Sequence, residues 1–355
     1  MSDTKLAAMK GYGEPITKML EKILSDLVDE FPENLSPQSH WALQELTDYV
    51  RRPGKRLRGS LAAYTYDYLK GNSAPSKQAL QLGAVLELLQ NYLLIIDDVM
   101  DQSPLRRGQP TVHVLYKSAY PDATLHEADM VAINVGLLAQ HIAGMVLTEI
   151  EEKADNIQTV NRIIHRNIAT TGLGQIDDLY EQIARKVSTT DIERKHLLKS
   201  AYYTFINPLQ AGFALAGVSD SKNDIIKYGG PAGTAFQVHD DYLGVFGDDT
   251  ETGKANLDDI REGKYTFMVQ YTLSHAETED VAKLTRILGN ERATAADLLL
   301  IRDIFTKIGA VEANRRLEKE SVAAAVVAAE SSDLWSKDFA GMLVDLVAYS
   351  VERIK

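Results

Sequence analysis

Apolar residues recur at three- and four-residue spacing along most of the chain, which is the pattern of amphipathic helices. The pattern predicts helices over residues 77–101, 125–153, 192–216, 224–243 and 296–327. No convincing run alternates apolar and polar residues in the way that strands do. No linker or internal repeat divides the chain, so we expect one all-α domain over residues 1–355, a single large helical bundle.

Several helix ends carry recognisable signals. Ser36 before Pro37 reads as an N-cap with proline at the first helical position. Gly54 is expected to open a helix that Gly71 closes. Thr190 has capping-box spacing to Glu193, and the acidic, glycine-containing segment 244–263 reads as a loop.

Composition narrows the range of functions. The 355 residues are 45% hydrophobic and 25% charged, which is ordinary for a folded domain and excludes disorder. The net charge of -12 makes general binding to nucleic acid or to an anionic membrane unfavourable. The chain has no cysteine, which fits a reducing compartment and favours a cytoplasmic protein.

No membrane segment is expected. The first thirty residues carry charges throughout and lack the apolar core of a signal peptide. The uncharged runs 130–148 and 201–219 approach spanning length, but both contain amides such as Asn134 and Asn207. These runs fit buried helices of a bundle better than membrane spans.

The most informative stretch is acidic and ends a predicted buried helix. Four of the five residues before Asp97 are Leu or Ile, and Asp97, Asp98 and Asp101 then project from one helix face. Carboxylates packed at a helix C-terminus repel one another and oppose the macrodipole. Mg²⁺ would relieve this, because it favours one or two carboxylates together with substrate phosphate oxygens. The alternative is a solvated helix end.

A second acidic pair, Asp240 and Asp241, ends another apolar helix. Two such helix ends facing one another could clamp several Mg²⁺ ions around one diphosphate. Lys55 and Arg58 beside Gly54 would suit a phosphate at a helix N-terminus. The other candidate cations are Arg106, Arg107, Lys199, Lys254 and Lys264. Each taken alone is more often a solvated surface charge.

These motifs, in this order, resemble the trans-isoprenyl diphosphate synthases, the all-α polyprenyl synthetase family. The matching elements are Gly54-Lys55-Arg56-Leu57-Arg58, Asp97-Asp98-Val99-Met100-Asp101, Arg106-Arg107-Gly108, Gly174-Gln175-Ile176-Asp177-Asp178, Lys199-Ser200-Ala201, Gln237-Val238-His239-Asp240-Asp241, Thr252-Gly253-Lys254 and Arg261-Glu262-Gly263-Lys264.

The resemblance implies that the chain condenses isopentenyl diphosphate with an allylic diphosphate through an allylic cation, and that it is a homodimer. It implies that Mg²⁺, three ions per active site, is held by Asp97, Asp101 and Asp240. The implied catalytic residues are Asp97, Asp98, Asp101, Arg106, Lys199, Asp240 and Lys254. The implied substrate-binding residues are Lys55, Arg58, Gln90, Arg106, Arg107, Lys199, Ser200, Gln237, Lys254 and Lys264. Of these, Lys55, Arg58, Gln90 and Arg107 would bind isopentenyl diphosphate.

The sequence departs from the family pattern at three positions. Gly244 replaces the third aspartate of the second motif, and Asp248 is a candidate replacement. Gln90 stands where bacterial members often have histidine, and Ser200 replaces a threonine but keeps the hydroxyl. We expect the site to survive all three changes.

Tyr92 and Leu93 precede the first motif by five and four positions, about one helical turn below it. In the family, bulk at these positions sets the floor of the product tunnel, and one aromatic with a smaller partner resembles a C20 enzyme. We therefore expect geranylgeranyl diphosphate as product, with a farnesyl or longer-chain product as the alternative. A class I terpene cyclase or a non-catalytic partner subunit is a further alternative, although Lys55, Arg58 and Arg107 suit a second diphosphate that a cyclase lacks.

Overall fold

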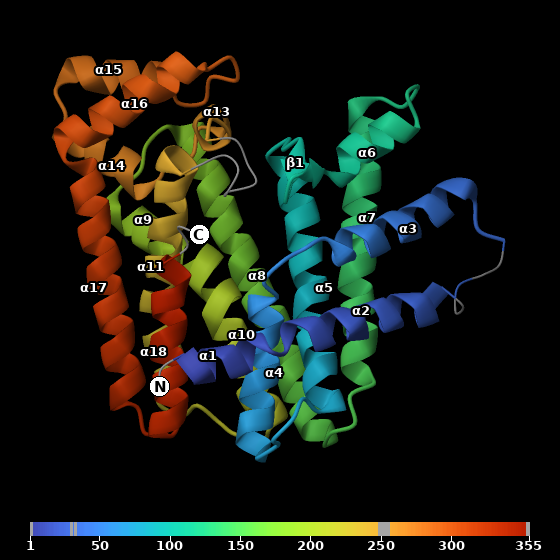
Figure 1. The fold of residues 1–355 in the computed structure, drawn as a ribbon. Helices are drawn as coiled ribbons and strands as arrows, with labels where there is room; N and C mark the ends of the chain where they lie inside the picture. The colour runs from blue at the N-terminus through green and yellow to red at the C-terminus, as the bar shows by residue number, and fades with distance from the viewer. Residues whose placement is uncertain (1–2, 29–30, 32–33, 248–255, 353–355) are drawn as a thin grey trace. The chain divides into compact units, whose positions relative to one another are not determined.

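The computed structural model describes residues 3–28, 31, 34–247 and 256–352. Its regular structure is almost entirely helical, which confirms the predicted all-α class (Figure 1). Among the described residues the strands are two short antiparallel ones, β1 (Leu105–Arg106) and β2 (Gln109–Pro110).

The described chain forms two compact units. The N-terminal unit comprises residues 7–163 and 208–219, and the C-terminal unit comprises the other described residues. The single domain expected over residues 1–355 stays a prediction.

The N-terminal unit is built on two long helices that pack along one another, α5 and α7 (Figure 1). The helices α2, α3 and α4 also pack against α5. Most of α5 is buried, which explains its almost continuous apolar sequence. The helices over residues 3–148 are α1 (Asp3–Lys10), α2 (Gly13–Val28), α3 (Pro37–Arg51), α4 (Leu57–Lys70), α5 (Lys77–Met100), α6 (Val112–Ala119) and α7 (Leu125–Thr148). The first four residues of α1 belong to the C-terminal unit.

The C-terminal unit is organised around α11, which packs against η1, α17 and α18. The remaining elements are α8 (Ala154–Ala184), α9 (Thr189–Lys195), the π-helix η1 (His196–Ile206), α10 (Asn207–Leu215), α11 (Asp224–Phe246), α13 (Asp258–Glu262), α14 (Phe267–His275), α15 (Thr278–Ile287), α16 (Ala295–Ile308), α17 (Ala310–Ser331) and α18 (Lys337–Val351). The helix α8 contributes residues to both units, and α10 lies in the N-terminal unit from Pro208 onward.

The predicted helix ends are partly confirmed. Ser36 caps α3 by accepting a hydrogen bond from the Ser39 amide, and Gly71 closes α4 in the left-handed conformation. The predicted start at Gly54 was wrong, because α4 begins three residues later and Arg56 is its N-cap. The predicted capping box at Thr190 was also wrong. The observed capping box joins Ser188 and Asp191, which lie two positions earlier in the chain than the predicted pair.

The long predicted segments are interrupted more often than their periodicity indicates. The segment 192–216 is divided among α9, η1 and α10, and the segment 296–327 is divided between α16 and α17 at Gly309. Gly309 adopts a left-handed conformation, which ends one helix and turns the chain into the next. The helix α7 ends at Thr148, five residues before the predicted end.

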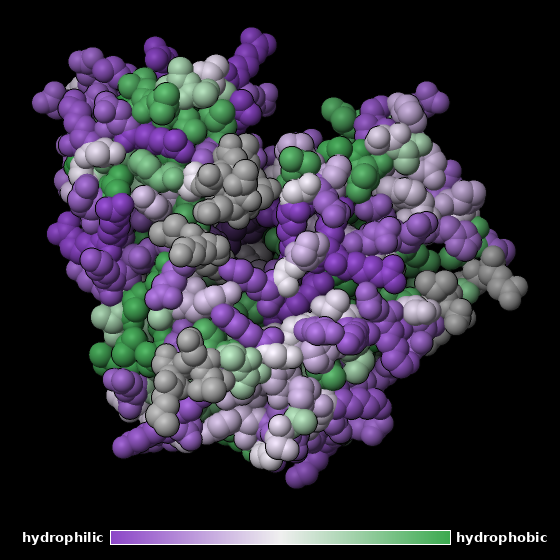
Figure 2. Space-filling view, viewed as in Figure 1, coloured by the Kyte–Doolittle hydropathy of each residue, from purple (hydrophilic) through white to green (hydrophobic). Residues whose placement is uncertain are grey.

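Within the described chain, α5 and α7 are long and apolar enough to cross a membrane by length and composition. In α5, 72% of the apolar window is buried inside the protein, which is expected for a core helix. In α7 the buried share is 44%, so a larger part of its apolar surface is exposed. Figure 2 shows that hydrophilic side chains cover most of the face in view and that hydrophobic ones are exposed in smaller groups.

Candidate active site

The first acidic motif occupies the last turn of α5, and its carboxylates differ in environment. Asp98 is buried, with 1% of its side chain exposed, whereas 27% of the Asp97 side chain is exposed. Asp98 accepts hydrogen bonds from the Tyr49 hydroxyl at 2.9 Å and from Arg106 Nε at 2.6 Å. Asp98 is therefore fixed inside the N-terminal unit by two side chains from other elements.

Arg106 connects the two adjacent acids. Its Nη2 lies 3.2 Å from Asp97 Oδ2 in addition to the contact with Asp98. Burial would lower the pKa of Arg106, but Asp98 and Asp97 outweigh it and raise the pKa. Burial raises the pKa of Asp98, although Arg106 and the Tyr49 hydroxyl act in the opposite direction. The Arg106 guanidinium thus offsets the charge repulsion that the sequence alone leaves uncompensated.

The residues present fit Mg²⁺ that is shared with a phosphate ligand. No cluster of three or more acidic or histidine side chains in the described part of the chain could hold a metal by itself. Asp97 and Asp101 are both partly exposed and lie one turn apart, whereas Asp98 faces inward. Mg²⁺ takes one or two carboxylates and completes its shell with water and phosphate oxygens. Asp97 and Asp101 supply this number of protein ligands.

Arg107 lies against the loop that carries Lys55. A Cβ placed on Gly54 would be 3.1 Å from the Arg107 guanidinium, and Arg107 Nη1 donates to the Arg52 carbonyl at 3.4 Å. The structure therefore brings together two of the elements that were expected to bind isopentenyl diphosphate. Gln90 is partly exposed on α5.

Arg56 is the buried member of this basic element. It adopts a left-handed conformation and donates Nη2 to the Val50 carbonyl at 2.5 Å, and its Nη1 lies 3.5 Å from Glu87. Glu87 also accepts the Gly59 amide at 3.0 Å. These contacts fix the start of α4. Lys55 lies before the first residue of α4, whereas Arg58 lies in the first turn of that helix.

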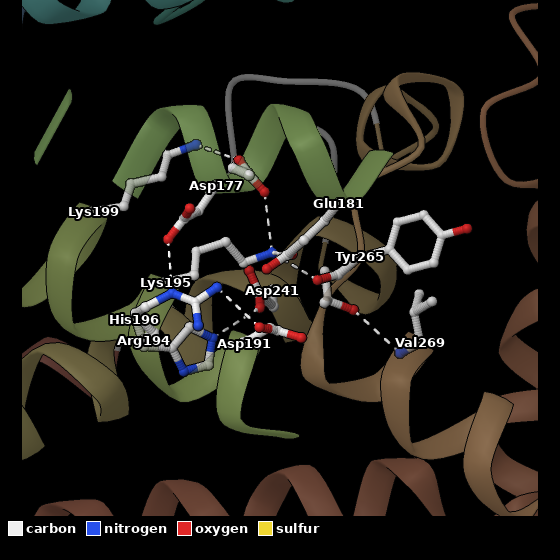
Figure 3. Close-up of polar contacts among 12 residues, drawn as sticks. Asp177, Glu181, Asp191, Arg194, Lys195, His196, Lys199, Asp241, Tyr265 and Val269 are labelled. Atoms are coloured by element: carbon white, nitrogen blue, oxygen red, sulfur yellow. Dashed lines mark hydrogen bonds and ion pairs between the residues drawn. The ribbon is translucent and has the colours of Figure 1, made fainter. Parts of the chain in front are cut away.

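In the C-terminal unit, Lys199 belongs to a cluster of ammonium and carboxylate groups (Figure 3). Lys199 Nζ lies 2.6 Å from Asp178 Oδ2, and Lys195 Nζ lies 3.0 Å from Asp178 Oδ1. Lys195 also donates to Glu181 at 2.6 Å and to the Tyr265 carbonyl at 2.8 Å. Burial would raise the pKa of Asp178, but the two lysines outweigh it and hold the pKa well below its usual range.

Gly174 allows Lys199 to approach Asp178. A Cβ at Gly174 would lie 2.5 Å from the Lys199 amide nitrogen, closer than side-chain atoms can come. The absence of a side chain therefore lets η1 pack directly on α8. Asp178 lies one turn further along α8, where its carboxylate meets Lys199.

The second acidic motif repeats the arrangement of the first. Asp240 is partly exposed, whereas Asp241 is buried and accepts a hydrogen bond from Gln237 Nε2 at 2.7 Å. Gln237 in turn accepts the Ser200 hydroxyl at 2.5 Å. His196 Nε2 lies 3.8 Å from Asp241 Oδ2. In both motifs the leading aspartate is partly exposed and the second is held by neighbouring side chains.

Gly244, the departure in the second motif, has a structural reason. A Cβ at this position would lie 2.0 Å from Asp259 Oδ2, so the Asp259 carboxylate fills the space of a side chain. Asp259 also pairs with Lys264 at 3.0 Å. Lys254 and Asp248 lie outside the described residues.

Among the described residues, several side chains that support the predicted site had not been assigned a role from the sequence. Tyr49 contacts Asp98, Asp259 contacts Lys264, and Lys195 contacts Asp178, which itself contacts Lys199. Tyr49 is 49 positions from Asp98, and nothing in its local sequence indicates that contact. Asp178 was recognised as part of a motif but without a role. Lys195 precedes Lys199 by about one helical turn, but it directly follows the charged residues Glu193 and Arg194, so its local sequence gives no signal for a buried ion pair.

Comparison with known proteins agrees with this geometry. The sequence profile described as polyprenyl synthetase matches residues 39–304. The chain belongs to the polyprenyl synthetase family. A geranylgeranyl diphosphate synthase from Saccharolobus solfataricus is 31% identical over 259 residues, covering 72% of this chain and 73% of the relative. A farnesyl diphosphate synthase from Dictyostelium discoideum is 27% identical, covering 91% and 88% of the two chains.

Solved structures of the polyprenyl synthetase family also match. A geranylgeranyl pyrophosphate synthase from Corynebacterium glutamicum, determined in complex with isoprenyl diphosphate and magnesium, has a TM-score of 0.89 to this chain. It is 27% identical, and the match covers 97% of this chain and 99% of that one. The protein is therefore an enzyme, a prenyltransferase of the isoprenyl diphosphate synthase type.

Proposed function

We propose that this polyprenyl synthetase condenses isopentenyl diphosphate with an allylic diphosphate to give geranylgeranyl diphosphate. The observation that carries the reaction type is the last turn of α5, where Asp97 and Asp101 are partly exposed and Asp98 is held inward by Arg106 and Tyr49. This arrangement supplies the carboxylates that a metal-bound diphosphate requires and keeps the neighbouring charge compensated.

The proposed roles of the basic residues follow from the family resemblance. Bound Mg²⁺, which we propose to number three ions, supplies charge stabilisation to the departing diphosphate. Arg106, Lys199 and Lys254 are proposed to bind the oxygens of that diphosphate. Arg106 uses Nε and Nη2 for its aspartates, and a guanidinium has five N–H donors, so it has further donors for a ligand.

The second substrate is proposed to bind beside the Lys55 loop. Lys55, Arg58, Gln90 and Arg107 would hold isopentenyl diphosphate, and the contact of Arg107 with Gly54 supports this assignment. When the allylic carbon–oxygen bond breaks, the double bond of isopentenyl diphosphate attacks the cation, and the departing diphosphate accepts the proton that leaves the adjacent carbon. Apolar surroundings must exclude water during this step, because water would capture the cation.

The product length is proposed to be set on α5. Tyr92 and Leu93 are both partly exposed and lie about one turn before Asp97. A single aromatic residue there leaves more room than two would, which supports a C20 product over a C15 product. The two relatives named above are a geranylgeranyl and a farnesyl diphosphate synthase, so kinship alone leaves both lengths open.

Release of diphosphate, measured with each substrate alone and with both together, tests the proposed reaction. A synthase needs isopentenyl diphosphate and an allylic starter together, and it needs Mg²⁺. We expect release only with both substrates. Release from the allylic diphosphate alone would instead indicate a terpene cyclase, and no release under any condition would favour a non-catalytic partner subunit.

We also propose that the enzyme is a cytoplasmic homodimer. Apolar side chains are exposed along α7, namely Leu125, Met130, Ile133, Leu137 and Met145, and along α8, namely Leu173, Ile176, Tyr180 and Ile183. Exposed apolar stripes of this kind favour burial against another chain. Light scattering during size-exclusion chromatography tests the proposal, and the mass of a single chain would contradict it.

A further inference from the structure

Lys195 is a buried lysine whose three donors are all used. It is 7% exposed and contacts Asp178 Oδ1, Glu181 Oε2 and the Tyr265 carbonyl at 3.0, 2.6 and 2.8 Å. Figure 3 shows its ammonium group directed toward Glu181 and Tyr265. An ammonium group has three donors, so Lys195 is fully satisfied by the protein. Lys195 therefore has no donor left for a ligand, and its effect on a ligand must come from its charge acting through the neighbouring side chains.

Lys195 is connected to Lys199 through Asp178, which contacts both lysines. The Asp178 carboxylate receives Lys195 on one oxygen and Lys199 on the other, at 3.0 and 2.6 Å. The Lys199 side chain is 28% exposed, whereas that of Lys195 is 9% exposed. Lys199 is thus the ammonium of this cluster that a ligand can reach, and Lys195 is the one that stays inside.

The charges of the cluster balance only when Lys195 is present. Two ammonium groups, Lys195 and Lys199, face two carboxyl groups, Asp178 and Glu181. Without Lys195, Lys199 would be the one ammonium of this cluster left in direct contact with Asp178, and the more distant Lys264 would act on Asp178 only through its charge. The potential at the exposed ammonium would become less favourable for an anion.

We propose that Lys195 is a positioning residue for the allylic diphosphate site, because it compensates Asp178 and Glu181 and so leaves the charge of Lys199 available to the substrate. This inference rests on the proposed role of Lys199 in binding that diphosphate. Lys195 itself does not contact the substrate. Glu181 opposes Lys195 in this arrangement, since its negative charge weakens the site.

Opposite charge changes at Lys195 and Glu181 test the proposal. Lys195→Met should weaken the binding of inorganic diphosphate with Mg²⁺, measured by calorimetry, by about tenfold or more, because the charges of Asp178 and Glu181 are then no longer compensated beside Lys199. Glu181→Gln should tighten the same binding severalfold. The double variant should lie near the wild type. Lys222→Met, which removes an exposed lysine of the same unit, is the matched control and should bind as the wild type does.

Steady-state kinetics place the effect at one substrate. Lys195→Met should raise KM for the allylic diphosphate by about the same factor as it weakens diphosphate binding, and should leave KM for isopentenyl diphosphate within about twofold. Equal changes in both KM values, or weaker diphosphate binding in Glu181→Gln, would overturn the proposal. Structural damage cannot tighten binding, so Glu181→Gln stays informative if Lys195→Met fails to fold. A wild-type enzyme without turnover would overturn the proposed function alone, because diphosphate affinity still reports on Lys195.

Discussion

At the scale of single residues, adjacent aspartates have different environments. Asp97 and Asp98 are neighbours in the sequence, yet Asp98 is buried against Tyr49 and Arg106 whereas Asp97 is partly exposed. Asp240 and Asp241 show the same division. We propose that the first aspartate of each pair meets the ligand and that the second holds its helix end in position.

This division predicts a crossed pattern of mutational effects. Asp97→Ala should lower kcat at least about a hundredfold, because the departing diphosphate loses charge stabilisation, and should change the free energy of unfolding little. Asp98→Ala should lower the free energy of unfolding by about 3 kcal/mol or more, because Arg106 is left without its buried partner. Initial rates and chemical denaturation of both variants check this. Near-normal turnover of Asp97→Ala would contradict the proposal that Asp97 binds Mg²⁺.

Arg107 gives a second prediction at this scale. Arg107→Ala should raise KM for isopentenyl diphosphate at least about tenfold, since a charged contact is lost, and should raise KM for the allylic substrate less. Arg51→Ala is the control, because Arg51 is exposed at the end of α3. A larger effect on the allylic substrate would reverse the assignment of the two pockets.

At the scale of elements, α5 connects the proposed metal-binding end to the residues proposed to set the product length. Tyr92 and Leu93 lie about one turn before Asp97 on the same continuous helix. Their side chains would therefore be held at a fixed distance from the proposed diphosphate site, where they are proposed to stop the growing chain.

Substitutions on α5 should change the product length in opposite directions. Leu93→Phe should shorten the main product to C15, because a second aromatic ring raises the floor. Tyr92→Ala should lengthen it beyond C20, because the floor is removed. Chromatography of the dephosphorylated products measures both. Unchanged product lengths in both variants would show that another element sets the floor.

Sequence patterns predicted where helices occur better than where a helical segment is broken into separate helices. The bounds of α5 and the cap at Ser36 follow from local periodicity and capping chemistry. The π-helix η1 does not, because its local sequence is apolar at ordinary helical spacing. The close approach of η1 to α8 at Gly174 is a tertiary contact, and no short-range pattern encodes it.

At the scale of the whole molecule, the predicted site residues are divided between the two units. The first acidic motif and the isopentenyl diphosphate residues belong to the N-terminal unit, whereas Lys199, Lys264 and the second acidic motif belong to the C-terminal unit. The family resemblance supplied the candidate residues of the proposed site. It did not predict the supporting contacts of Tyr49 or Lys195, because these join residues distant in sequence or lie outside the motifs.

Removal of Mg²⁺ should abolish turnover without unfolding the protein. Asp98 and Asp178 are compensated by Arg106, Lys195 and Lys199, so these buried acids do not depend on a metal for their charge balance. Chelation should leave the helical circular dichroism and the melting temperature unchanged and stop product formation. A large loss of helicity on chelation would mean that the metal is part of the fold.

The most direct test of the central claim is the product formed by the wild-type enzyme. Labelled isopentenyl diphosphate is incubated with Mg²⁺ and with each of the C5, C10 and C15 allylic starters, and the dephosphorylated products are separated by chain length. We expect incorporation that ends at C20. A C15 endpoint would contradict the product assignment, and no incorporation from any starter by the folded protein would contradict the account as a whole.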